Sequence, residues 1–437
     1  MIGITAYGVC LPYYRIKRRT IFEAMGWFNP GLAGIASGEK TVANHDEDSL
    51  TLAASAGMDC CLSGALKAGT TALISALSDS DPGLKLVAAS DCRLGKAGGS
   101  QEGLFGDAAV AFKGGNEDPI AVFEGHYSLS ADFSDTRRVE GDQFVRPWEE
   151  RWIRQEGYLK FIPQSIRGLL GKAGFEMKDI AKVVFPPLSA RDHSALARSM
   201  RLEKDQVQDP LLGGVGNAGA AHPLLMLASA LEEARPGDRV VVASYGSGSD
   251  ALLFRVTEAA AAYGNRNKVQ QNIAYKQEMD SYPKYLSFKE MLDKEVGIRG
   301  EEIAVTSLSL TWRERDAVLR LAGGKCLACG TPQFPRESMC VNPACGAVEQ
   351  MEDYTFADKP AHLFTFTADH LAYSEDPPNL YGIVDFDGGG RYWFDLTDCR
   401  LDQLTIGQPV QMSFRRKYQD KARSLYGYFW KAMPLKD

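Results

Sequence analysis

Four of the nine cysteines crowd into twenty residues, and their spacing is typical of a metal site. They are Cys326, Cys329, Cys340 and Cys345, which gives the pattern CxxC, ten residues, CxxxxC. Two short knuckles can place four thiolates tetrahedrally around one ion, so the spacing predicts a zinc ribbon. Because four protein ligands close the coordination sphere, we expect the zinc to be structural and not catalytic. Two reduced cysteine pairs are the alternative, and they leave the neighbouring turn residues Gly330 and Pro343 unexplained.

Two other stretches place glycine and alanine directly before an apolar helix, at Gly64 to Leu77 and at Gly216 to Leu231. The start of a helix offers unpaired backbone N–H groups and the positive end of the helix dipole, which stabilise a nucleophile or an oxyanion. Each stretch leads to an apolar strand, then to glycines with an aspartate, and then to a second apolar run. The repetition predicts an internally duplicated α/β core.

The composition limits the class of protein. With 437 residues and 45% apolar side chains, the chain can form two to four domains around a large core. A net charge of −7 argues against nucleic acid as a partner, although local positive sites can still hold anionic ligands. No apolar run approaches a membrane span, and the first residues alternate like a strand rather than a signal peptide. We therefore expect a cytoplasmic protein without a membrane partner.

Changes of pattern divide the chain into four segments. Residues 1–257 have the duplicated α/β pattern, and residues 258–325 resemble a connector with two helical stretches. The zinc ribbon follows at residues 326–350. Residues 351–437 consist of short alternating strands separated by Gly, Pro and Asp turns, which predicts a small closed β-barrel of five or so strands.

Two polar regions of the first segment allow more than one interpretation. The run His45, Asp46 and Glu47 lies before an apolar helix, and we expect it to be a solvated helix cap. The stretch from Ser130 to Phe161 is rich in Arg, Trp and Glu and has no strict period. It could line a cleft, but an exposed helix pair is the interpretation we favour.

Several motifs together carry a resemblance to a known family. They are GITAYGVCLPYYRIKR, DEDSLTLA, AASDCRLGKAGGSQEGLFGDAAVAF, GNAGAAHP and SYGSGSDALLF. The first 257 residues resemble the hydroxymethylglutaryl-CoA synthase branch of the thiolase superfamily, and the archaeal type most. Residues 326 to the end resemble the zinc-ribbon and OB-fold family that accompanies such enzymes. The resemblance implies a layered thiolase-like fold followed by the ribbon and an OB-type barrel, and acyl-CoA, a CoA thioester, as substrate. It also implies a homodimer, or a hetero-oligomer with a thiolase subunit.

The chain departs from this family at the residues that do the chemistry. The synthases carry their nucleophile in Ala-Cys-Lys-Ala-Gly-Thr, and the matching position here is Leu66, which cannot be acylated. Their catalytic histidine stands in Phe-His-x-Pro, where this chain has Phe185-Pro186-Pro187. Their catalytic glutamate lies in a strand-containing unit that is missing here between Cys61 and Leu66, either because the chain has lost it or because the printed sequence omits it. The covalent step of the family is therefore not expected.

Other parts of the family site remain. Asn217 occupies the family's asparagine position and can donate to a thioester or enolate oxygen at a helix start. The residues Gly246, Ser247 and Gly248 resemble the turn that brings backbone N–H groups beside the same oxygen. His222 and His193 are candidate bases, because imidazole titrates near neutral pH. For each histidine the alternative is a structural role, which for His222 means hydrogen bonding within the helix start.

Two functions of different classes follow. The first is an enzyme that makes or breaks a carbon–carbon bond of a CoA thioester without a covalent intermediate. The second is a non-catalytic acyl-CoA-binding subunit that organises an active thiolase. Both are implied by the family resemblance and not by the composition.

Overall fold

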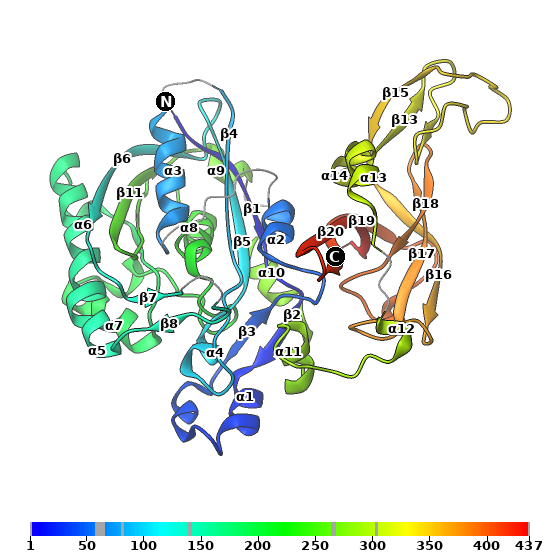
Figure 1. Cartoon of the computed structure of the whole chain (residues 1–437). Coiled ribbons are helices and arrows are strands. Elements are labelled where there is room, and N and C mark those ends of the chain that lie inside the picture. The colour runs from blue at the N-terminus through cyan, green and yellow to red at the C-terminus, as the bar shows by residue number, and fades with distance from the viewer. Residues whose placement is uncertain are drawn as a thin grey trace. The chain divides into compact units, whose positions relative to one another are not determined.

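The computed structural model describes residues 2–56, 66–79, 83–138, 142–263, 268–301 and 305–435. It forms two compact units, which are described separately (Figure 1). The first unit comprises residues 1–43 and 48–289, and the second comprises residues 44–47 and 290–437. The boundaries expected at residues 257, 325 and 350 stay predictions. The missing strand unit and the cysteines Cys60 and Cys61 lie outside the described residues.

A seven-stranded sheet is the framework of the first unit, with the order β4-β5-β1-β6-β11-β10-β9. The strands are β1 (Gly3–Cys10), β4 (Lys85–Asp91), β5 (Ala108–Gly115), β6 (Ala121–Ser130), β9 (Lys182–Val184), β10 (Arg239–Ala243) and β11 (Gly248–Val256). Neighbouring strands are antiparallel, except for the parallel pair of β9 and β10. The hairpin-like pairs β4/β5 and β10/β11 flank the central pair β1/β6 in mirrored order. This arrangement confirms the duplicated core.

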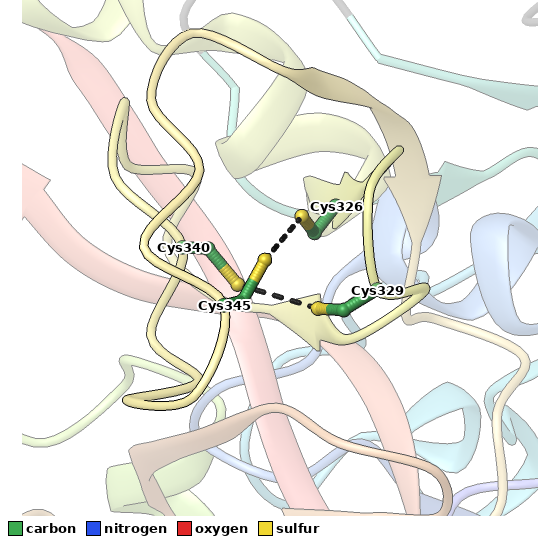
Figure 2. A group of neighbouring side chains, drawn as sticks. All are labelled: Cys326, Cys329, Cys340 and Cys345. Atoms are coloured by element: carbon green, nitrogen blue, oxygen red, sulfur yellow. Dashed lines mark hydrogen bonds between the residues drawn. The ribbon is translucent and has the colours of Figure 1, made fainter.

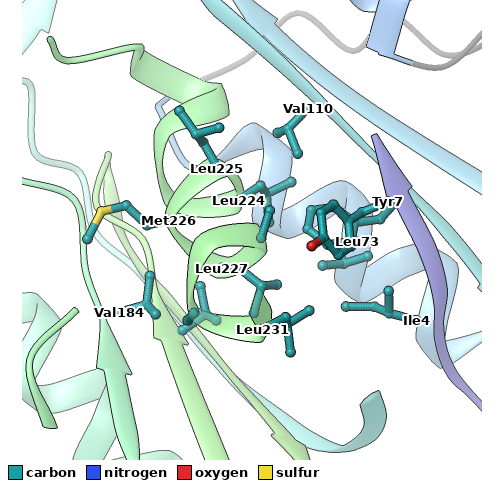
Figure 3. Close-up of a cluster of buried hydrophobic side chains, with 14 of the residues drawn as sticks. Ile4, Tyr7, Leu73, Val110, Val184, Leu224, Leu225, Met226, Leu227 and Leu231 are labelled. Carbon is teal, nitrogen blue, oxygen red and sulfur yellow. The ribbon is translucent and has the colours of Figure 1, made fainter. Parts of the chain in front are cut away.

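Two helices, α3 (Ala68–Ser78) and α8 (His222–Glu233), pack on one face of this sheet. Every residue of α8 from His222 to Leu231 is buried, as expected for a helix that is apolar on all sides. Figure 3 shows the leucines of α8 among side chains of the sheet and of α3. A Cβ atom on Gly69 would lie 2.6 Å from the carbonyl oxygen of Ala220, so glycine permits the close approach of the two helix starts.

The opposite face of the sheet is covered as well. Val240 and Val242 of β10 face the cluster around α8, whereas Val241 and Ala243 belong to a second cluster. Alternate residues of a strand point to opposite faces, so the sheet is a middle layer. Helices α6 (Leu159–Ala173) and α7 (Ala190–Ser199) contribute to the second cluster, and α2 (Ser49–Ala56) packs against β5.

Smaller elements complete the first unit. A three-stranded sheet has the order β12-β2-β3, with β2 (Tyr14–Lys17), β3 (Glu39–Val42) and β12 (Gln277–Glu278). The remaining helices are α1 (Arg18–Met25), α4 (Ser100–Leu104), α9 (Ala259–Tyr263), α10 (Val269–Ala274) and α11 (Tyr282–Phe288). The stretch expected to be an exposed helix pair instead contains β7 (Thr136–Arg137), β8 (Arg146–Pro147), α5 (Glu150–Trp152) and the π-helix η2 (Ile153–Tyr158).

The second unit consists of short helices, the cysteine-rich ribbon and a five-stranded sheet. The helices are α12 (Ile298–Glu301), α13 (Leu308–Arg313) and α14 (Arg315–Arg320). The ribbon sheet has the order β14-β13-β15, with β13 (Ala322–Cys326), β14 (Pro332–Gln333) and β15 (Met351–Thr355). No helix among the described residues is long and apolar enough to cross a membrane.

The five-stranded sheet, orange to red in Figure 1, has the order β18-β17-β16-β19-β20. Its strands are β16 (Ala361–Asp369), β17 (Asn379–Phe386), β18 (Arg391–Asp395), β19 (Pro409–Asp420) and β20 (Leu425–Pro434). The predicted closed barrel is corrected here. Within the described residues the two edge strands form no ladder with each other, and only an isolated bridge joins Leu396, just after β18, to Ala432 of β20.

Candidate functional site

The four cysteines converge as their spacing predicts (Figure 2). All four sulfur atoms lie within 4.8 Å of one another. The Sγ atoms of Cys326 and Cys345 are 3.7 Å apart, and those of Cys329 and Cys340 are 3.5 Å apart. Zinc–sulfur bonds of about 2.3 Å in a tetrahedron separate two sulfurs by about 3.8 Å. The residues therefore fit one tetrahedral zinc ion.

Backbone hydrogen bonds hold each knuckle in place. Cys326 ends β13, and the amide of Gly330 donates to its carbonyl oxygen at 2.8 Å. Gly330 has a φ of +75°, a left-handed conformation that glycine adopts without strain. In the second knuckle the amide of Asn342 donates to the sulfur of Cys340 at 3.4 Å. The ligands are thus fixed by local turns, which is why their spacing alone identifies them.

The glycine turn lies against the start of α3. Gly246 has a φ of +154°, and a Cβ atom there would lie 3.0 Å from the amide nitrogen of Leu66 and 3.2 Å from that of Lys67. The turn residues Ser247 and Gly248 also have positive φ. The glycine turn and the start of α3, which are far apart in the sequence, therefore lie close together. The side chain at this contact is the aliphatic Leu66.

A buried carboxylate lies behind this meeting point. Asp250 is 1% exposed, and its Oδ2 accepts hydrogen bonds from the hydroxyls of Thr71 at 2.6 Å and Thr70 at 3.2 Å. The ammonium of Lys67 lies 3.4 Å from its Oδ1. The equivalent aspartate of the first repeat, Asp107, is also 1% exposed and pairs with Lys289. Sequence reasoning assigned these aspartates no role, although their recurrence after the glycines was a signal.

Asn217 is held at the start of α8 by its own chain. Its Oδ1 accepts from Nη2 of Arg93 at 2.7 Å and from the amide of Gly219 at 3.0 Å. Its Nδ2 donates to the carbonyl oxygen of Pro187 at 2.8 Å, which leaves one amide hydrogen for another acceptor. The Arg93 guanidinium is in turn 3.4 Å from Asp91 and stacks on a phenyl ring. Sequence reasoning missed Arg93, because nothing local links it to Asn217.

His222 is fully buried, and both of its ring nitrogens bond to the backbone. The amide of Ala218 donates to Nδ1 at 3.1 Å, so Nε2 carries the proton and donates to the carbonyl of Pro210 at 2.9 Å. Burial lowers the pKa of His222 to about 4, and its hydrogen bond to Pro210 acts in the opposite direction. These contacts are those of a histidine that stabilises the helix start; a catalytic role stays a prediction.

His193 has a different environment on α7. Its ring stacks on Phe185, with 4.3 Å between the ring centroids, and the side chain is 4% exposed. Its Nε2 atom has no hydrogen-bond partner among the described residues. Burial lowers the pKa of His193 to about 4, whereas nearby Asp209 and a backbone hydrogen bond with Phe185 raise it. The histidine thus lies beside the Phe-Pro-Pro segment whose Pro187 binds Asn217, and it is uncharged at neutral pH.

The aromatic region lines a pocket of about 210 Å³. The lining residues are Ser134, Asp135, Arg137, Trp148 and Trp152. Of the two interpretations of this region, the cleft agrees with the structure and the exposed helix pair does not.

The acidic run is not a solvated cap, and that expectation is corrected. Asp46 and Glu47 are 2% and 7% exposed, and both pair with the buried guanidinium of Arg415 in the second unit. Only Asp48 caps α2, because its Oδ1 accepts from the amide of Thr51 at 2.9 Å.

Family models match three parts of the chain. Residues 170–255 match the C-terminal part of 3-oxoacyl-[acyl-carrier-protein] synthase III. Residues 313–349 match the rubredoxin-like zinc ribbon domain of ChsH2, and residues 354–415 match its C-terminal OB-fold domain. The predicted zinc ribbon and OB fold are confirmed.

Curated relatives match the first part of the chain. The hydroxymethylglutaryl-CoA synthase of Methanopyrus kandleri is 30% identical over 309 residues, which cover 59% of this chain and 88% of the relative. That of Archaeoglobus fulgidus is 27% identical and covers 66% and 98%. Among solved structures, the hydroxymethylglutaryl synthase of the curacin pathway has a TM-score of 0.57 at 19% identity, over 66% of this chain and 88% of its own. A hydroxymethylglutaryl-CoA synthase complexed with CoA has a TM-score of 0.56 at 17% identity, over 70% and 94%.

The duplicated sheet with two central helix starts is a thiolase-like fold. The two solved structures named above share this fold. The chain belongs to the hydroxymethylglutaryl-CoA synthase family of the thiolase superfamily. The expected fold class is confirmed, with the zinc ribbon and the OB fold following in the same chain.

Proposed function

We propose that the protein takes part in making or breaking carbon–carbon bonds of CoA thioesters, and that it does so without a covalent acyl-enzyme. Family membership supports the coarse activity. The observation that carries the finer claim is Leu66, which lies against Gly246 at the start of α3. A side chain without a nucleophilic atom there leaves the substrate untethered.

The chemistry then needs a base and a site for negative charge. Of the two histidines His193 is the better placed base, because its Nε2 has no hydrogen-bond partner among the described residues, although a pKa lowered to about 4 makes it a weak base at pH 7. It would accept a proton from a β-hydroxyl or an α-carbon of the thioester. The remaining amide hydrogen of Asn217 and the N–H of Ser247 in the glycine turn would hold the enolate oxygen, because the N–H of Gly246 already donates to the carbonyl oxygen of Gly248 at 3.1 Å.

Zinc has a structural role in this proposal. Its four cysteine ligands close the coordination sphere, so it would hold the ribbon loops together and leave no position for a substrate.

A second candidate is a non-catalytic acyl-CoA-binding subunit of a complex with an active thiolase. Two observations favour it. Both nitrogens of His222 are occupied by backbone groups, and Asn217 is already bonded at both ends of its amide. Groups that are satisfied within their own chain have less to offer a transition state.

An assay of the purified full chain with panels of β-hydroxyacyl-CoA and β-ketoacyl-CoA separates the candidates. The enzyme proposal expects turnover by the chain alone, reduced about 10²- to 10⁴-fold in His193→Gln. The exposed histidine variant His362→Gln is the matched control and should keep full activity. If the purified chain has no turnover by itself but raises the activity of an added thiolase, the organising subunit is supported instead.

A further inference from the structure

The pocket in the aromatic region is lined by two indole rings, and each ring contacts a neighbouring side chain. The Trp152 ring stacks on Phe133 with a centroid distance of 4.0 Å and an angle of 11° between the planes. The guanidinium of Arg137 lies 5.0 Å from the centre of the Trp148 ring. Asp135, on the same wall, is 7% exposed. Trp152 is thus held by a buried ring, whereas the half-exposed Trp148 is contacted by the Arg137 guanidinium.

Two backbone hydrogen bonds connect the pocket loop with the candidate site. The amide of Ala131 donates to the carbonyl oxygen of Ser247 in the glycine turn at 3.0 Å. The amide of Val145 donates to the carbonyl oxygen of Leu94, next to Arg93, at 3.2 Å. The segment that carries the pocket residues is therefore tied by its backbone to the glycine turn and to the residue after Arg93.

The size of the pocket suits one group of a larger ligand. Whole-ligand pockets measure about 300–1,000 Å³, whereas an apolar cavity of about 150 Å³ is enough to bind benzene. A pocket of about 210 Å³ fits one ring or two fused rings. Indole faces favour flat partners, since stacked rings attract each other beyond the burial of area.

The charge of the pocket indicates which end of a thioester it takes. The nucleotide end of CoA carries several phosphate charges, whereas the pocket lining offers one guanidinium, Arg137, and one carboxylate, Asp135, which offset each other. The acyl end carries no such charge. Resting on the proposed function, we propose that this pocket binds the ring of a ring-bearing acyl group, so that aromatic or cyclic acyl-CoA thioesters are the preferred ligands.

Binding of thioesters to the full chain tests this inference. Phenyl- or naphthyl-bearing acyl-CoA, linear acyl-CoA of equal carbon number and free CoA would be compared by calorimetry. We expect the ring-bearing thioesters to bind about three- to tenfold more tightly than the linear ones. Trp148→Ala, at a half-exposed position that the fold tolerates, should abolish this preference and change the affinity for free CoA less than about twofold.

The control is Trp312→Ala, another exposed tryptophan, which should leave all affinities unchanged. Equal loss of affinity for free CoA and for every thioester in Trp148→Ala would overturn the inference, because the pocket would then hold the nucleotide end. Equal affinity of the wild type for ring-bearing and linear acyl groups would also overturn it. Turnover that persists in either case leaves the proposed function standing, and selective binding without turnover leaves only this inference standing.

Discussion

Replacing Arg415 by methionine perturbs a buried cluster of charges in the second unit. The guanidinium is 3% exposed and contacts Glu47 at 2.8 Å, Asp398 at 2.6 Å and Asp46 at 3.3 Å. Lys431 lies 2.8 Å from Asp46 and is the second cation of the cluster. Three carboxyl groups thus share two cations, and Arg415 is the cation that touches all three.

The expected loss follows from this geometry. Removing one partner of a buried ion pair costs about 3–5 kcal/mol, because the remaining charge is left without compensation. Burial raises the pKa of Glu47 to about 7, although Arg415 acts in the opposite direction, so this carboxyl can shed its charge by taking up a proton. Asp398 and Asp46 would still lose their ion pairs with Arg415, so the expected loss of stability stays within that range. We therefore expect Arg415→Met to lower the free energy of unfolding of the second unit by about 3–5 kcal/mol.

Urea unfolding followed by tryptophan fluorescence measures this loss, since the buried Trp430 reports on the five-stranded sheet. The control is Arg423→Met, which removes an ion pair with Asp420 whose arginine side chain is 62% exposed. That variant should lose less than about 1 kcal/mol. A loss below about 1 kcal/mol for Arg415→Met would refute the reasoning, because the cluster would then be well solvated.

Three further predictions concern pH, metal and packing. The pKa of Glu47 is raised from 4.5 to about 7 in the folded state, so its stabilising contribution is complete below pH 4.5 and is lost as the pH rises through 7. Glu47→Gln should flatten the pH dependence of the free energy of unfolding between pH 4 and 8. An unchanged pH dependence would contradict the assignment. A chelator, or Cys326→Ser, should remove one zinc per chain and expose the β13–β15 amides to hydrogen exchange, since structural zinc contributes about 10–16 kcal/mol of binding free energy in zinc-finger peptides. Amides that stay protected without metal would argue against a structural zinc. Gly69→Ala should destabilise the first unit by about 1–3 kcal/mol in thermal unfolding, because the added Cβ would meet the Ala220 carbonyl. The control is Gly171→Ala in α6, whose Cβ would meet no atom within 4 Å and which should not destabilise the unit. Equal effects of the two substitutions would refute the close packing.

The parts of the fold that depend on local spacing were predictable from the sequence. The zinc ligands lie within two short turns, and the repeated small-residue helix starts reveal the duplicated core. Their geometry is set by neighbours in the chain, so spacing and periodicity carry enough information.

Long-range contacts were not predictable in the same way. Arg93 meets Asn217 from 124 residues away, and Asp46 meets Arg415 from 369 residues away. An acidic run before a helix has the same local pattern whether solvent or a distant arginine neutralises it. The aromatic region shows no period because its strands, its helix and its π-helix are each too short to repeat one, so its pocket could not be placed from the sequence.

The central claim is that no acyl group is tethered at the start of α3. Intact-mass spectrometry of the full chain after incubation with acyl-CoA tests it most directly, with Leu66→Cys measured beside the wild type. We expect no added mass on the wild type and one acyl group on the variant, because the turn of Gly246 still faces that position. An acyl adduct on any sulfur of the wild-type chain would contradict the account.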